Sequence, residues 1–117
     1  MTTAPGDPAT STDSNYAERR SVPRYSLIAS AEIFEPISGV RMSGRISEIS
    51  RKGCYLDVLN TLPTGTILQL RISRDQGTFT SSASIIYAQD GMGMGIAFQN
   101  PAPDQLKILD SWLAELT

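Results

Sequence analysis

A short box near the amino end of the chain holds three arginines that ordinary secondary structure does not explain. Arg19, Arg20 and Arg24 form the pattern R-R-x-x-x-R. Pro23 lacks a backbone N–H and restricts Val22 to extended conformations, so a helix through the box is disfavoured and a loop is expected. Arginine forks bind phosphate in bidentate fashion and stack on flat rings. The box therefore suits an anionic, aromatic ligand, with a solvated basic loop as the alternative.

A second box, Glu-Ile-Ser-Arg-Lys-Gly at 48–53, lies between two strand-like runs. Together the boxes resemble the PilZ domain family, whose signature is RxxxR followed by [D/N]xSxxG. Arg20 and Arg24 match the first motif, and Ser50 and Gly53 match the second. Glu48 stands where the family pattern has Asp or Asn. The runs 44–56 and 93–98 also resemble family strands, and the resemblance covers roughly 18–116.

This resemblance implies a receptor for cyclic di-GMP, a bacterial second messenger with two phosphates and two guanines. Arg20 and Arg24 would bond phosphate oxygens or the guanine O6/N7 edge and stack on purine faces. Glu48 would accept from guanine N1–H and N2–H₂, and its extra methylene would affect affinity more than ligand identity. Ser50 offers a hydroxyl. Gly53 permits a close backbone approach or a positive φ.

Two further residues are assigned to the site by the same resemblance. An arginine at the position of Arg19 tends to accompany binding of a stacked, intercalated cyclic di-GMP dimer, which we carry over as a hypothesis. Tyr87 stands where some family members have an aromatic residue, so it is predicted to present its ring to a guanine. A core or surface strand tyrosine is an equally good interpretation of Tyr87.

Six strands and one helix must position these residues. Alternating or β-branched runs predict strands near 25–35, 40–49, 54–58, 66–73, 78–88 and 92–98, with Asp90-Gly91 as the clearest hairpin signal. Val40, Met42, Gly44 and Ile46 are expected on one face of the second strand. The residues predict a small antiparallel barrel that closes its own edges, in agreement with the six-stranded barrel that the resemblance implies.

A short amphipathic helix is predicted after Pro103, with Leu106, Leu109, Leu113 and Leu116 along one stripe. Asn or Asp is expected to cap its start. About twelve residues make a marginal helix alone, so we expect it to cap one end of the barrel, with dimerisation as the rival. Trp112 is expected in the core or at an interface.

Length and composition limit the classes of protein to which this chain can belong. The 117 residues predict a disordered polar leader at 1–16 and one domain at 17–117. The net charge of −2 disfavours a general nucleic-acid binder. Histidine is absent and Cys54 is the single cysteine, which removes histidine bases, thiolate metal clusters and internal disulfides. Cys54 is expected as a small buried residue. We therefore predict neither an enzyme nor a cofactor other than the ligand itself.

The sequence also gives expectations for the location, the partner and the alternative functions of the protein. The sequence shows neither a signal-peptide pattern nor an apolar run of transmembrane length, so a cytoplasmic bacterial protein is expected without membrane insertion. With no output domain in the sequence, a partner protein of unknown identity must read the bound state. The chain is expected to be a monomer or a homodimer. The alternatives are a PilZ-like interaction module that has lost its ligand and a small barrel that binds single-stranded nucleic acid.

Overall fold

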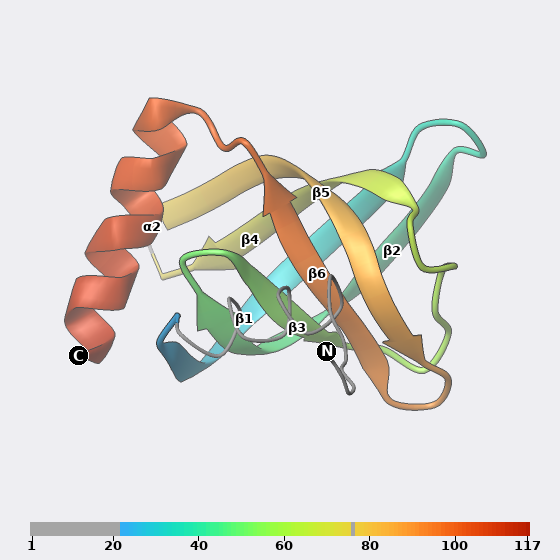
Figure 1. The fold of residues 1–117 in the computed structure, drawn as a ribbon, viewed down its shortest axis with the longest axis horizontal. Helices are drawn as coiled ribbons and strands as arrows, with labels where there is room; N and C mark the ends of the chain where they lie inside the picture. The colour runs from blue at the N-terminus through green and yellow to red at the C-terminus, as the bar shows by residue number, and fades with distance from the viewer. Residues whose placement is uncertain (1–21, 76) are drawn as a thin grey trace, which may run out of the picture.

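The computed structural model describes residues 22–75 and 77–117, which form a closed barrel and a helix (Figure 1). The elements are β1 (Arg24–Glu35), β2 (Val40–Ser50), β3 (Gly53–Asp57), β4 (Ile67–Arg74), β5 (Gly77–Gln89), β6 (Gly93–Gln99) and α2 (Pro103–Leu116). The strand order around the barrel is β1-β2-β3-β6-β5-β4, and each neighbouring pair is antiparallel. The predicted six-stranded antiparallel barrel with a C-terminal helix is confirmed.

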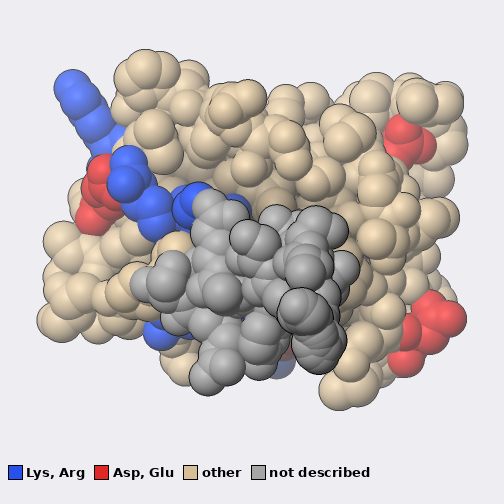
Figure 2. Space-filling model, viewed as in Figure 1, with Lys and Arg blue, Asp and Glu red and all other residues tan. Residues whose placement is uncertain are grey.

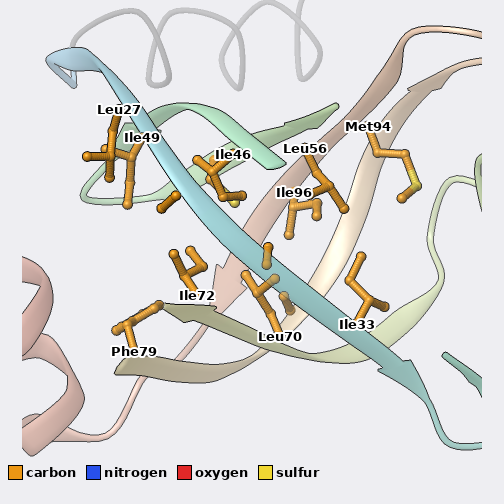
Figure 3. Close-up of a cluster of buried hydrophobic side chains, with 14 of the residues drawn as sticks. Leu27, Ile33, Ile46, Ile49, Leu56, Leu70, Ile72, Phe79, Met94 and Ile96 are labelled. Atoms are coloured by element: carbon orange, nitrogen blue, oxygen red, sulfur yellow. The ribbon is translucent and has the colours of Figure 1, made fainter. Parts of the chain in front are cut away.

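The barrel interior is filled by the apolar residues of the alternating runs. On β1, Leu27, Ala29, Ala31 and Ile33 are buried, and the residues between them are exposed. Figure 3 shows side chains from several strands meeting inside the barrel. Burial of each large aliphatic side chain contributes about 1.5–3 kcal/mol. The largest fully buried side chains are Phe79, Ile33, Ile46, Ile49, Leu56, Leu68, Leu70, Ile72, Ile85, Met94, Ile96 and Leu109.

The second strand departs from strict alternation after Ile46. Val40 is exposed, whereas Ile46 and Ile49 are both buried although three positions separate them. A register shift between Ile46 and Glu48 in the pairing with β3 accounts for the burial of both isoleucines, because a bulge adds one residue to β2 and changes which of the following residues face the core. The prediction that Val40, Met42, Gly44 and Ile46 share one face is confirmed, because these residues pair with the buried, alternating residues of β1 from Glu35 to Ala29. After this bulge, Ile49 faces the core and the Glu48 side chain is half-exposed.

The hairpin turns follow the predicted turn residues. Gly91 has a φ of 81°, and the Met92 amide donates to the Gln89 carbonyl at 2.9 Å, which closes the β5–β6 hairpin. Such a positive φ is accessible to glycine at little steric cost. In the β1–β2 turn, Gly39 likewise has a positive φ of 79°.

Helix α2 lies across one end of the barrel, opposite the end where the β1–β2 hairpin projects (Figure 1). Its Leu109 and Trp112 are buried, and the Trp112 ring lies 6.5 Å from the Phe79 ring. The predicted capping position is confirmed. The predicted Asn or Asp cap is wrong, because the N-cap is Ala102 and it makes no side-chain cap bond. Pro103 begins the helix instead, at a position where its missing N–H costs nothing.

Candidate functional site

The two sequence boxes meet at one end of the β1–β2 pair. Arg24 is the first residue of β1 and lies directly opposite Ser50, the last residue of β2. The Arg24 Nη1 atom is 3.7 Å from Glu48 Oε1, and the two side chains are 41% and 46% exposed. An arginine and a carboxylate are thus presented together to solvent, beside the second box.

Part of the predicted arginine loop is strand. The strand β1 begins directly after Pro23, so Arg24 is fixed by strand pairing and the loop assignment is wrong for it. Arg19 and Arg20 lie outside the described residues, as does the predicted leader at 1–16.

Ser50 stabilises the turn that contains the second box. Its side chain is largely buried, and Oγ accepts from the amides of Lys52 at 3.1 Å and Gly53 at 3.2 Å. The Lys52 carbonyl accepts from the Phe98 amide of β6 at 2.9 Å. These bonds hold the turn against β6. The hydroxyl that the sequence offered as a ligand contact is directed to the protein backbone.

Gly53 is required by the neighbouring strand. A Cβ at this position would lie 2.1 Å from the carbonyl oxygen of Ile96, which belongs to β6. Among the described glycines, a positive φ occurs at Gly39, Gly65 and Gly91 and not at Gly53. The positive-φ alternative is therefore wrong, and the close backbone approach is that of β6. Because Gly53 has no side chain, the second box can pack closely against β6.

Strand register joins Glu48 to Tyr87 in one row across the outer face. Glu48 pairs with Tyr55 of β3, Tyr55 with Gly95 of β6, and Gly95 with Tyr87 of β5. Three strand spacings separate the Cα atoms of Glu48 and Tyr87, about 14 Å. Tyr87 is 37% exposed, which fits a surface tyrosine and excludes the core interpretation. The structure thus brings Arg24, Glu48 and Tyr87 onto one continuous surface.

Tyr55 is the residue of this row that the sequence reasoning missed. Its ring centroid lies 6.0 Å from that of Tyr87, with planes tilted by 36°. Each ring lies over a glycine of β6, since a Cβ at Gly93 would be 2.7 Å from Tyr55 Cε2 and one at Gly95 would be 2.3 Å from Tyr87 Cε1. The alternation of Tyr55 with buried Cys54 and Leu56 was the available signal for an outward side chain.

The Tyr55 hydroxyl is a hydrogen-bond donor at neutral pH. It donates to Gln89 Oε1 at 2.9 Å. Partial burial, the neighbouring Tyr87 and the nearby Asp57 raise the pKa of Tyr55 above its ordinary value, so the phenol keeps its proton. The bond to Gln89 fixes the ring over β6. Glu48, Tyr55 and Tyr87 therefore form a preorganised surface with one carboxylate and two aromatic rings.

The second box also contacts the C-terminal helix. Arg51 follows Ser50 in the turn, and its Nε lies 2.9 Å from Asp110 Oδ1 on α2. Figure 2 shows the Lys and Arg side chains of this face mainly on the side that carries α2, with acidic side chains both beside them and on the opposite side.

A groove of about 440 Å³ lies elsewhere on the barrel. It contains Arg41, whose guanidinium carbon is 4.5 Å from the Phe34 ring centroid, and Arg71, which is paired with Glu32 at 2.8 Å. Ile33 of this groove lies nine positions along β1 from Arg24, about 30 Å of strand. None of the predicted site residues that the structure describes lines this groove. We therefore place the candidate site at the two boxes.

The described residues also include one buried thiol. Cys54 is buried as predicted, and burial raises the pKa of its thiol well above the ordinary value. Within 22–75 and 77–117, no three Cys, Asp or Glu side chains gather where they could hold a metal ion. No helix in these ranges is long and apolar enough to cross a membrane.

Comparison with known proteins agrees with this fold. A model of the PilZ domain matches residues 18–115. Three solved structures share the fold: the PilZ domain of YcgR from Escherichia coli with c-di-GMP (TM-score 0.70, 17% identity, 84% of this chain and 91% of that chain), MotI/DgrA, an inhibitor of motility from Bacillus subtilis (0.66, 15%, 83% and 50%), and the PilZ domain of CeSA from a cellulose-synthesizing bacterium (0.64, 18%, 80% and 97%). A comparison with curated proteins found no match.

The fold is a small closed antiparallel barrel in which Arg24 of the first box and the second box lie together at one end of the β1–β2 pair. Because the family model covers most of the chain, the chain belongs to the PilZ domain family. The identities to the three structures are below 20%, so those comparisons establish the shared fold. The chain spans half the length of MotI/DgrA.

Proposed function

We propose that this protein is a bacterial cyclic di-GMP receptor that acts in the cytoplasm and delivers its signal to a partner protein. The observation that carries the proposal is the meeting of Arg24, Glu48 and the Ser50–Gly53 turn at one edge of a PilZ barrel. The family membership supports a ligand-binding receptor in place of an enzyme. The YcgR PilZ domain, which shares the fold, was solved with c-di-GMP.

Arg24 and Glu48 suit two different parts of the ligand. The Arg24 guanidinium can donate a fork of hydrogen bonds to a phosphate or to a guanine O6/N7 edge. Glu48 can accept from guanine N1–H and N2–H₂, and its ion pair with Arg24 holds both groups at the site before the ligand arrives. Ser50 and Gly53 act through the turn they form. Arg20 is assigned a role beside Arg24, and Arg19 a role in holding a second, intercalated ligand molecule.

Tyr87 and Tyr55 extend the proposed site along the row. Purine bases stack on aromatic rings, and such stacking contributes about 1–3 kcal/mol per base. The two rings are held by β6 glycines and by the bond to Gln89, so little ordering is needed on binding. Residues before Arg24 are proposed to close over the ligand. A partner would then read the composite surface of ligand and barrel.

Titration calorimetry with cyclic di-GMP tests the proposal. Arg24→Ala is expected to weaken binding about tenfold to hundredfold, because a charge-assisted hydrogen bond contributes roughly 1.5–3 kcal/mol. The double variant Arg20→Ala, Arg24→Ala should bind more weakly still. Two ligands per chain would support the role given to Arg19, and one would contradict it.

A matched control is Arg71→Ala, which removes an exposed arginine paired with Glu32 in the distant groove. It should bind as the wild type does. Loss of affinity in Arg71→Ala equal to that in Arg24→Ala would indicate a general charge effect and contradict the site. A folded wild-type chain that does not bind cyclic di-GMP would overturn the receptor and favour an interaction module, in which the Arg24–Glu48 pair is satisfied without ligand.

A further inference from the structure

The motif turn and α2 are connected by one ion pair that the proposed site does not use. Arg51 Nε and Asp110 Oδ1 are 2.9 Å apart, and both side chains are 53% exposed. Arg51 comes directly after Ser50, which faces Arg24 across the β1–β2 pair. The guanidinium group of Arg51, in the second box, is thus held by α2, the helix that follows the barrel in the sequence.

Strand geometry places Arg51 close to the proposed phosphate position. Opposed residues of an antiparallel pair have Cα atoms about 4.5–5.5 Å apart, and consecutive Cα atoms are about 3.8 Å apart. The Cα of Arg51 is therefore within about 9 Å of the Cα of Arg24. Because both side chains are long and exposed, both guanidinium groups can reach one anion bound between them. That anion and the Asp110 carboxylate would compete for Arg51.

We propose that Asp110 is a positioning residue that withholds Arg51 from the ligand and thereby weakens binding. The inference rests on the proposed function, which it extends with a regulatory contact. Since coupling between two sites is reciprocal, ligand that recruits Arg51 also loosens the tie between the motif turn and α2. The helix then senses whether the site is occupied.

Loss of the ion pair leaves the fold intact. Helix α2 is held by its buried Leu109 and Trp112, and an exposed pair contributes little to stability. The same helix supplies a matched control, Glu115, which pairs with Arg74 at 2.8 Å. Substitution of either acid by its amide removes one negative charge and one ion pair from α2. The two substitutions differ in whether the freed arginine belongs to the motif turn.

Calorimetric titration with cyclic di-GMP, at one fixed salt concentration, tests the proposal. Asp110→Asn is expected to bind roughly two- to fivefold more tightly than the wild type, the range that an exposed ion pair permits. Glu115→Gln should bind as the wild type does. In an Arg51→Ala background, Asp110→Asn should change nothing, because the group that Asp110 withholds is absent.

Trp112, the single tryptophan of the chain, provides a second measurement on α2. Ligand should change its emission in the wild type, and the change should be smaller in Asp110→Asn and in Arg51→Ala. Equal affinities for Asp110→Asn and Glu115→Gln would overturn the proposed role of the Arg51–Asp110 ion pair, and the receptor proposal would stand. Tighter binding through Asp110→Asn in the Arg51→Ala background would assign the effect to general charge and also overturn it. A folded wild-type chain without any binding would overturn both proposals.

Discussion

At the scale of single residues, the second box is defined as much by backbone packing as by ligand chemistry. Ser50 bonds the amides of its own turn, and Gly53 makes room for the Ile96 carbonyl. Either residue would be needed in this barrel even without a ligand. Arg24 and Glu48 differ, since both are exposed and their pairing is not needed to close the strands. The motif therefore combines two residues that build the turn with two that face solvent.

Gly53→Ala should destabilise the protein strongly. Its Cβ would overlap the Ile96 carbonyl, so β3 and β6 must separate, and overpacking with lost ladder bonds costs at least about 2 kcal/mol. Urea unfolding measures the change. The control is Gly65→Ala, where open space surrounds the Cβ and only the positive φ of 91° is strained, at a cost of about 1–2 kcal/mol. A smaller loss in Gly53→Ala than in Gly65→Ala would contradict the argument.

At the scale of elements, the β1–β2 hairpin carries a pH-dependent contact remote from the site. The Ser38 hydroxyl and the amides of Ser38 and Ile37 donate to the Glu35 carboxylate and hold its pKa below the ordinary value. A pKa that is lower in the folded than in the unfolded state means that the contact stabilises the fold above the unfolded pKa. This contribution is lost as pH falls through the folded pKa.

Glu35→Gln should therefore lower the melting temperature at pH 7 and have a smaller effect in acid, where the wild-type carboxylate is also protonated. Thermal unfolding at pH 7 and pH 3 measures both differences. Ser38→Ala removes the largest cause of the shift and should act in the same direction. An equal loss of melting temperature at both pH values would show that the charge of Glu35 does not matter.

At the scale of the whole molecule, the buried core of the described residues begins later in the chain than the residues proposed to bind the ligand. The buried core lies between Leu27 and Trp112, whereas the arginine box begins at Arg19. We propose that residues 1–16 are a leader outside the domain at 17–117. Folding would then depend on the barrel, and ligand binding on the barrel together with the box that precedes it.

Removal of residues 1–16 should leave both the melting temperature and the affinity for cyclic di-GMP unchanged. Removal of residues 1–20 also takes Arg19 and Arg20, and it should keep the melting temperature while weakening binding. Calorimetric scanning and titration of the two shortened chains measure these effects. A lower melting temperature in the first truncation would place part of the leader within the folded domain.

The sequence by itself determined the architecture and the two boxes. Alternating apolar residues require one buried face per strand, and Asp90-Gly91 specifies a tight turn, so six strands and their hairpins could be read locally. The position of α2 followed from its apolar stripe, because a short helix must bury that face. The match of Arg24, Ser50 and Gly53 to a known signature needed only their spacing along the chain.

Only the tertiary structure decided which distant residues share a surface. The row from Glu48 through Tyr55 to Tyr87 depends on a β3–β6 pairing between strands that are not consecutive in sequence. The bulge before Glu48 changes which of the following residues face the core, and local alternation does not predict that change. The Arg51–Asp110 contact likewise arises from closure of the barrel beneath α2. Register and closure are set by packing of the whole core, so these features could not be derived from any single segment.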